Sequence, residues 1–210
     1  ENLDDSYALT YTNFIDFNND KQKDNYKDIS VKSYNKKDSD QLIDYFCKDG
    51  PIVPSTIMVK SYIFKNIGNF DENLRYYEDT DFYLRVLEKY KIYHLNDFSC
   101  FKRKHQHQIT NQLYELIPFG DLVVKKAIKR NKNLHRYKNI RYSRNRNKAA
   151  THALFYLDKK KIAQKLILDS LNINPFSFYS WILFFLILFP RLIRLFIIRL
   201  IKCLKNVNTS

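Results

Sequence analysis

The sequence RYYEDTDFYLR, residues 75–85, decides how this chain is interpreted. Apolar and aromatic residues recur every four positions from Phe82 to Tyr90, and Asp81 precedes Arg85 by four, so a helix is predicted from about residue 79. Three acids then lie at its start. Acids there stabilise exposed backbone N–H groups and the helix dipole, but a carboxylate held at a cleft by a helix end also suits a general base. The spacing alone leaves both interpretations open.

Segments typical of strands and helices alternate on both sides of this stretch. Runs of β-forming residues predict strands at 7–15, 53–59, 91–95 and 98–105. Short helices are expected at 39–48 and 61–67, the second ended by Gly68. Residues 17–40 are dominated by Asn, Asp, Lys and Ser and predict a long loop. Interleaved strands and helices are typical of the α/β class, which we expect for residues 1–110.

Charge is distributed unevenly along the 210 residues. The chain has 36 Lys and Arg against 22 Asp and Glu, a net charge of +14, yet residues 1–100 sum to −5 and residues 101–210 to +19. A half this basic predicts an anionic partner. Only three glycines are present and none forms a GxGxxG or P-loop motif, which argues against kinases, P-loop NTPases and Rossmann dehydrogenases. Three scattered cysteines argue against a disulfide scaffold and a zinc ribbon and fit a reducing compartment.

Beyond residue 110 the sequence becomes basic and helical. Helices are expected at 112–131, 145–157 and 159–172, the last two as a hairpin, so we assign residues 111–175 to a helical region. From Leu122 to Ala149 there are eleven Lys and Arg and no acid. Such a run can follow a nucleic-acid backbone or lie on an anionic lipid surface. The sequence that follows favours lipid.

The last segment, residues 176–210, predicts a hydrophobic and basic tail that associates with a membrane. Residues 181–190 are uninterrupted apolar sequence, but ten residues are too few to span a bilayer. Between residues 191 and 205, five Lys and Arg fall on one stripe of a helix and Leu, Ile and Phe on the rest, typical of a helix lying in a membrane interface. A tilted span over 181–201 and a buried core helix are the alternatives. We expect residues 181–205 to bind an anionic membrane surface, peripherally and on its cytoplasmic face.

Four sequence blocks in a fixed order carry a family resemblance: PSTIMVK (54–60), IGNFDE (67–72), YEDTDFYLR (77–85) and RKHQHQIT (103–110). This succession resembles the second half of the family 2 glycosyltransferases, inverting enzymes of the GT-A fold. It covers residues 5–110 and implies that residues 1–110 are the acceptor-side half of a GT-A domain. One departure is Asn69, where the family usually has a second glycine.

The resemblance implies roles for individual residues. Asp79 corresponds to the catalytic base that deprotonates the acceptor hydroxyl, and Glu78 lies beside it near the acceptor. Asp81 matches a family position too, but its pairing with Arg85 favours a structural role. His105 corresponds to a histidine that approaches the divalent metal or the donor diphosphate; its own sequence context equally allows a surface or core histidine.

The same resemblance implies the substrates and the metal: a nucleotide-sugar donor, a glycan or lipid-linked acceptor, and Mg²⁺ or Mn²⁺. The chain opens at Glu1 and its one methionine is Met58, so we expect the family's nucleotide-binding strands and its Asp-x-Asp metal motif upstream of the strand at 7–15. Residues 1–210 alone are therefore expected to be inactive in transfer. Two other classes stay open: a non-catalytic membrane-docking or scaffold protein and, less favoured, a basic nucleic-acid-binding module.

Overall fold

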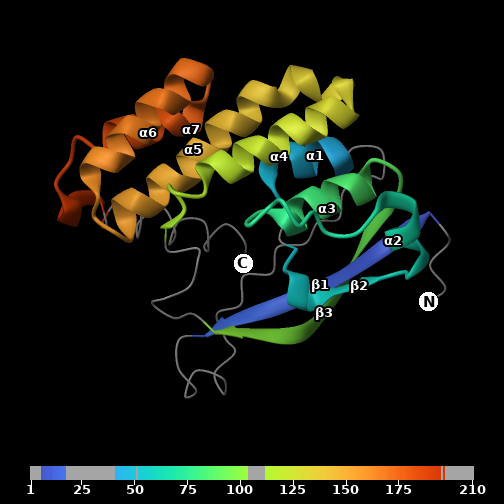
Figure 1. Cartoon of the computed structure of the whole chain (residues 1–210). Coiled ribbons are helices and arrows are strands. Elements are labelled where there is room, and N and C mark those ends of the chain that lie inside the picture. Colours follow the sequence, from blue (N-terminus) through green and yellow to red (C-terminus); the bar gives the residue numbers. More distant parts are fainter. Residues whose placement is uncertain (1–5, 18–40, 51, 104–111, 195, 197–210) are drawn as a thin grey trace. The chain divides into compact units, whose positions relative to one another are not determined.

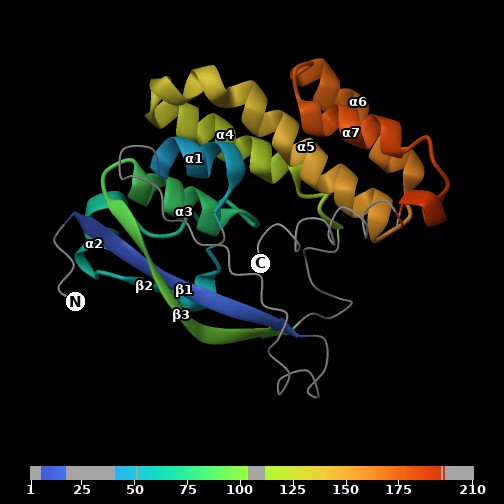
Figure 2. The same cartoon turned by 180° about the vertical axis from the view of Figure 1, so that it is seen from behind.

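The computed structural model describes residues 6–17, 41–50, 52–103, 112–194 and 196 (Figures 1 and 2). The chain divides into two compact units: unit 1 spans residues 1–108 and 119–138, and unit 2 spans residues 109–118 and 139–210. A three-stranded mixed sheet is followed by a mostly helical C-terminal region. The mixed α/β class expected from the sequence is therefore confirmed.

The sheet of unit 1 has the strand order β2-β1-β3. The central strand β1 (Tyr7–Phe17) pairs antiparallel with β2 (Ile57–Val59) and parallel with β3 (Lys91–Arg103). The sequence predicted two strands where β3 is one. The register explains the difference. Thr12 lies opposite Leu95 but Asn13 lies opposite Phe98, so two residues of β3 are bulged out of the register and the strand continues beyond them.

Helices α1 (Gln41–Lys48) and α3 (Glu78–Leu87) lie over one face of this sheet (Figures 1 and 2). The ring of Phe82, on α3, stacks between Phe64 and Phe70, with centroids 5.4 and 4.6 Å away. Phe64 belongs to α2 (Tyr62–Ile67), which ends at Gly68 with a positive φ of 82°, as its sequence predicted. These ring contacts hold α3 against α2 and against the segment that follows α2.

Two boundaries in unit 1 differ from the sequence prediction because of proline. Pro54 opens a 3₁₀ turn, η3 (Pro54–Thr56), so that β2 begins at Ile57 and not at 53. Helix α4 (Ile117–Arg130) begins with a proline in its first turn and not at 112, since proline is favoured at the first helical positions. A second 3₁₀ segment, η5 (Lys132–Tyr137), follows α4.

Unit 2 is built from α5 (Lys138–Phe155), α6 (Lys160–Ile173) and α7 (Phe178–Leu186), shown in yellow to red in Figure 1. The predicted hairpin of α5 and α6 is present, although α5 starts seven residues earlier than expected. Its core contains alanines of α5 at 149, 150 and 153 against Leu166 and Ile167 of α6 and Leu183 of α7. One face of α7 is therefore core, as the buried-helix interpretation expected. Within the described residues, no helix combines the length and apolarity needed to cross a bilayer.

Candidate active site

The N-terminal turn of α3 presents two carboxylates, Glu78 and Asp79, both half-buried. Oδ1 of Asp79 accepts hydrogen bonds from the Thr80 backbone N–H at 2.6 Å and the Thr80 hydroxyl at 3.2 Å. Oδ2 of Asp79 and the Glu78 carboxylate have no hydrogen-bond partner among the described residues. These carboxylate oxygens can therefore accept a proton or a hydrogen bond from a substrate, as a general base must.

The third acid of the same turn, Asp81, is fully used in holding unit 1 together. Its side chain is 1% exposed, and its two oxygens accept from Arg85 Nε and Arg130 Nη1, each at 2.9 Å. Arg85 also donates to the carbonyl oxygens of Ile67, Gly68 and Asn69 at the end of α2, at 2.6, 3.1 and 2.8 Å. The predicted pair of Asp81 and Arg85 is confirmed, and Asp81 joins α3 to α2 and α4.

Tyr77, the residue before α3, adopts a left-handed conformation with φ of 65°. A side chain with a Cβ in this region costs about 1–2 kcal/mol. This strained residue directly precedes Glu78 and Asp79 and turns the chain into α3. Strained backbone of this kind is frequent at functional sites.

Tyr83 follows Asp79 by one helical turn, and sequence reasoning gave it no role. Its ring is fully buried, with the Tyr45 ring edge-on at 6.1 Å, and its hydroxyl has no hydrogen-bond partner among the described residues. Burial, and then the negative charges of Asp79 and Glu78, raise the pKa of this hydroxyl. Tyr83 therefore stays protonated beside the two acids. Its spacing of four residues from Asp79 was the signal that could have marked it.

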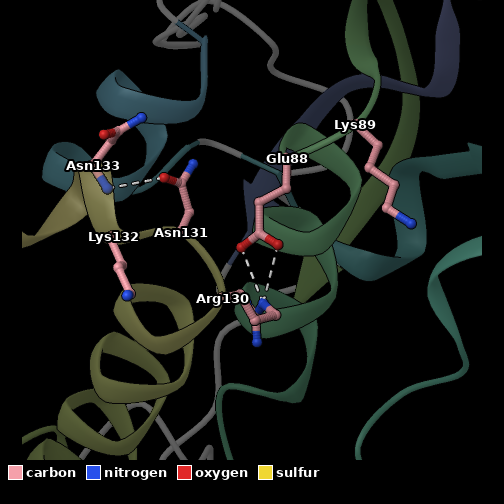
Figure 3. Close-up of a pocket in the computed structure, with 6 residues that line it drawn as sticks. All are labelled: Glu88, Lys89, Arg130, Asn131, Lys132 and Asn133. Carbon is pink, nitrogen blue, oxygen red and sulfur yellow. Dashed lines mark hydrogen bonds and ion pairs between the residues drawn. The ribbon is translucent and has the colours of Figure 1, made fainter.

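Two pockets of unit 1 lie along α3. One, of about 360 Å³, is lined by Glu88, Lys89, Arg130, Asn131, Lys132 and Asn133 (Figure 3). The other, of about 260 Å³, is lined by Asn69, Asp71, Asp81, Arg85, Lys126 and Arg130. Arg130 lies in both and donates through Nε to Glu88 at 3.0 and 3.1 Å, as Figure 3 shows. Burial raises the pKa of Glu88, and the Arg130 charge opposes this only in part. Internal ion pairs thus line both pockets, and neither includes Asp79 or Glu78.

A metal centre is not assembled within the part of the chain that the structure describes. No group of three His, Cys, Asp or Glu side chains suited to a metal ion occurs there. His105, the predicted metal or diphosphate contact, lies outside the described residues. Its role stays a prediction. His94 is described and is a core histidine, since it is buried and shares a 2.8 Å hydrogen bond with Asn13.

Comparison with protein families, with curated proteins and with solved structures finds no match to this chain.

Proposed function

We propose that this chain is the acceptor side of an inverting glycosyltransferase of the GT-A fold, with Asp79 as its general base. The observation that supports it is the contrast within one helical turn. Asp81 is enclosed by two arginines, whereas Asp79 and Glu78 keep unpartnered oxygens at a half-buried helix start. The four sequence blocks that carry the family resemblance are the second support for the proposal.

In the proposed reaction the oxygen of an acceptor hydroxyl attacks the anomeric carbon of a nucleotide-sugar. The bond between that carbon and the diphosphate oxygen breaks, and the nucleoside diphosphate leaves. The hydroxyl proton passes to Oδ2 of Asp79, the oxygen that Thr80 does not engage. Glu78 beside it is placed to accept a hydrogen bond from the acceptor, which we take to be a glycan or a lipid-linked sugar.

The family also uses Mg²⁺ or Mn²⁺, which stabilises the charge of the leaving diphosphate. The described residues do not supply a ligand set for such an ion. The contribution assigned to these residues is therefore proton removal and acceptor positioning, and the donor-binding groups are expected upstream of residue 7.

The test is Asp79→Asn in the full-length protein, including any residues encoded upstream of Glu1. Release of nucleoside diphosphate is measured over a panel of nucleotide-sugars with glycan and lipid-linked acceptors. Loss of the base should lower transfer about 100-fold or more while donor affinity is unchanged. Glu72→Gln, at an exposed acid just before α3, is the matched control and should retain activity.

Two results would overturn the proposal. Transfer by Asp79→Asn above about a tenth of the wild-type rate would remove Asp79 as the base. Failure of the full-length wild type to bind any nucleotide-sugar would instead favour the non-catalytic docking protein. The nucleic-acid alternative has less support in the structure, because Lys126 and Arg130 pair with acids and Arg141 is buried.

A further inference from the structure

The outer face of α7 and of the residues after it is apolar and exposed. We define this outer face by six side chains: Phe178, Trp181, Phe185, Leu188, Leu192 and Phe196. The first four follow one another at intervals of three or four residues, as one stripe of a helix does. Phe178 is 79% exposed, Phe185 56% and Leu192 81%. A surface this apolar on a folded unit marks a docking site.

The opposite side of the same segment already fills the core of unit 2. Leu183 and Ile187 belong to that core with the alanines of α5 and with Leu166 and Ile167 of α6. Ser180, also on the inner side, is fully buried and hydrogen-bonds Asn147 and Ser170. The segment is thus apolar on both sides. One side packs inside unit 2, and the other, the outer face, is left without a partner in the unit.

The charge of unit 2 identifies the kind of surface that fits this face. Unit 2 contains 13 Lys and Arg against three acids, a net charge of +10. Its exposed cations include Lys148, Lys159, Lys160, Lys161, Lys165 and Arg191. An exposed apolar face with Trp, Phe and Leu on a unit rich in Lys and Arg is typical of proteins that lie in the headgroup region of anionic bilayers.

Asp158 fixes the start of the segment after α7. It lies in the turn between α5 and α6 with φ of 53°, and its two oxygens accept from Arg191 at 3.4 Å and Arg194 at 3.2 Å. Arg194 is buried. The sequence had placed both arginines on a stripe that faces lipid headgroups; the structure uses them to hold residues 191–194 onto the helical hairpin. Leu192 between them stays exposed.

We propose that unit 2 docks on an anionic lipid bilayer through this outer face. The aromatic and leucine side chains lie at the boundary between headgroups and acyl chains, and the lysines contact phosphate groups. In this arrangement the outer face lies in the plane of the membrane interface. The inference is independent of the transferase proposal, since binding to vesicles requires no turnover.

Trp181 makes the test direct, because it is the only tryptophan of the chain and lies on the outer face. The full chain is mixed with phosphatidylcholine vesicles and with vesicles in which about a third of the lipid is phosphatidylglycerol. Binding is followed by co-sedimentation and by Trp181 emission. We expect a blue shift and binding with the anionic vesicles, and quenching of Trp181 by lipids brominated near the top of the acyl chain.

The variants Phe185→Ser and Leu192→Ser should each weaken binding to anionic vesicles about tenfold or more, since each removes one large apolar group from the membrane. Leu168→Ser is the matched control: Leu168 is an exposed leucine of α6 that is not one of the six side chains of the outer face, and its loss should leave binding unchanged. Circular dichroism checks that each variant is folded.

Three results would overturn the proposal. The first is Trp181 emission that no lipid composition changes. The second is binding that salt abolishes and that neither serine variant weakens, since purely electrostatic binding does not use the outer face. The third is a dimer in the absence of lipid that shifts Trp181 emission, which would assign the outer face to a second copy. The proposal is overturned in the same way if nucleic acid displaces the protein from vesicles and the serine variants have no effect on binding.

Discussion

Asp79 and Asp81 lie two positions apart in the same helical turn and have opposite surroundings. Asp81 is buried between the guanidinium groups of Arg85 and Arg130, so its charge is compensated inside the unit. Asp79 is half-buried, and among the described residues its carboxylate accepts hydrogen bonds only from Thr80. The residue type alone does not tell which of two aspartates at a helix start is structural and which is free to act as a base. The neighbours supplied by α2 and α4 separate them, and those neighbours are distant in sequence.

These surroundings predict different stabilities for two matched substitutions. Asp81→Asn removes the negative charge from two enclosed arginines and should lower the free energy of unfolding by about 3–5 kcal/mol. Asp79→Asn keeps an oxygen that can accept from Thr80 and loses only the negative charge at the helix N-terminus, which should cost about 0.3–1 kcal/mol. Urea unfolding of both variants measures the difference. Equal losses would show that Asp81 is not the structural acid.

At the scale of elements, the sequence predicted the order of strands and helices well and several boundaries poorly. Local rules located α2, because Gly68 takes the positive φ that ends it, and they located the start of α3. They failed at β3, which the sequence divides at Asn96 and Asp97, because pairing with β1 carries the strand past them. The start of α5 was missed because residues 138–144 are polar and basic, while packing within unit 2 makes them helical.

The site was predicted in the same uneven way. Helical periodicity and the family resemblance together indicated Glu78 and Asp79. They did not indicate Arg130, since its contact with Asp81 joins positions 49 residues apart. The strained φ of Tyr77 also carried no sequence signal, because tyrosine is not a residue that favours this conformation.

The buried residues in the first part of α5 are polar, from Arg141 to Asn147, which no amphipathic pattern predicts. Asn147 donates to the Ser180 hydroxyl at 2.8 Å, and Ser170 lies 2.9 Å from Ser180 and 2.8 Å from Ser143. This network joins α5, α6 and α7. A buried network in which each hydroxyl has a partner specifies one helix register, and loss of a member removes a hydrogen bond from its neighbours.

Asn147→Ala should therefore destabilise unit 2 by about 1 kcal/mol, because the Ser180 hydroxyl loses its amide partner and keeps only the hydroxyls of Ser170 and Ser177. Asn139→Ala is the control, because Asn139 is exposed in the first turn of α5. Thermal unfolding followed by Trp181 fluorescence reports on unit 2. A control that lost as much stability as Asn147→Ala would show that the network contributes nothing specific.

At the scale of the whole molecule, charge and packing both follow the two units. Unit 1 has a net charge of +4 and unit 2 of +10. The basic run of residues 122–149 is divided between them at position 138 and so is not one continuous feature of a single unit. Chemistry assigned to α3 belongs to unit 1 and the proposed membrane contact to unit 2, so each can be changed by substitutions that leave the other in place.

The division into units predicts that a pH effect built into unit 1 stays in unit 1. Burial raises the pKa of Glu88 above its ordinary value of 4.5, so the folded state binds this proton more tightly than the unfolded state. As pH falls through the raised folded pKa towards 4.5, protonation of Glu88 therefore adds stability, and this contribution is lost as pH rises again. Glu88→Gln has no proton to bind and should remove that part of the pH dependence.

Urea unfolding at several pH values between about 7 and 4.5 tests this in wild type, in Glu88→Gln and in the exposed control Glu72→Gln. Circular dichroism follows both units, whereas the fluorescence of Trp181 follows unit 2. We expect Glu88→Gln to flatten the pH dependence of the circular dichroism transition and to leave the Trp181 transition unchanged. If the two transitions coincide and Glu88→Gln shifts both equally, the units unfold as one, because only coupling between them would carry a change at Glu88 to Trp181.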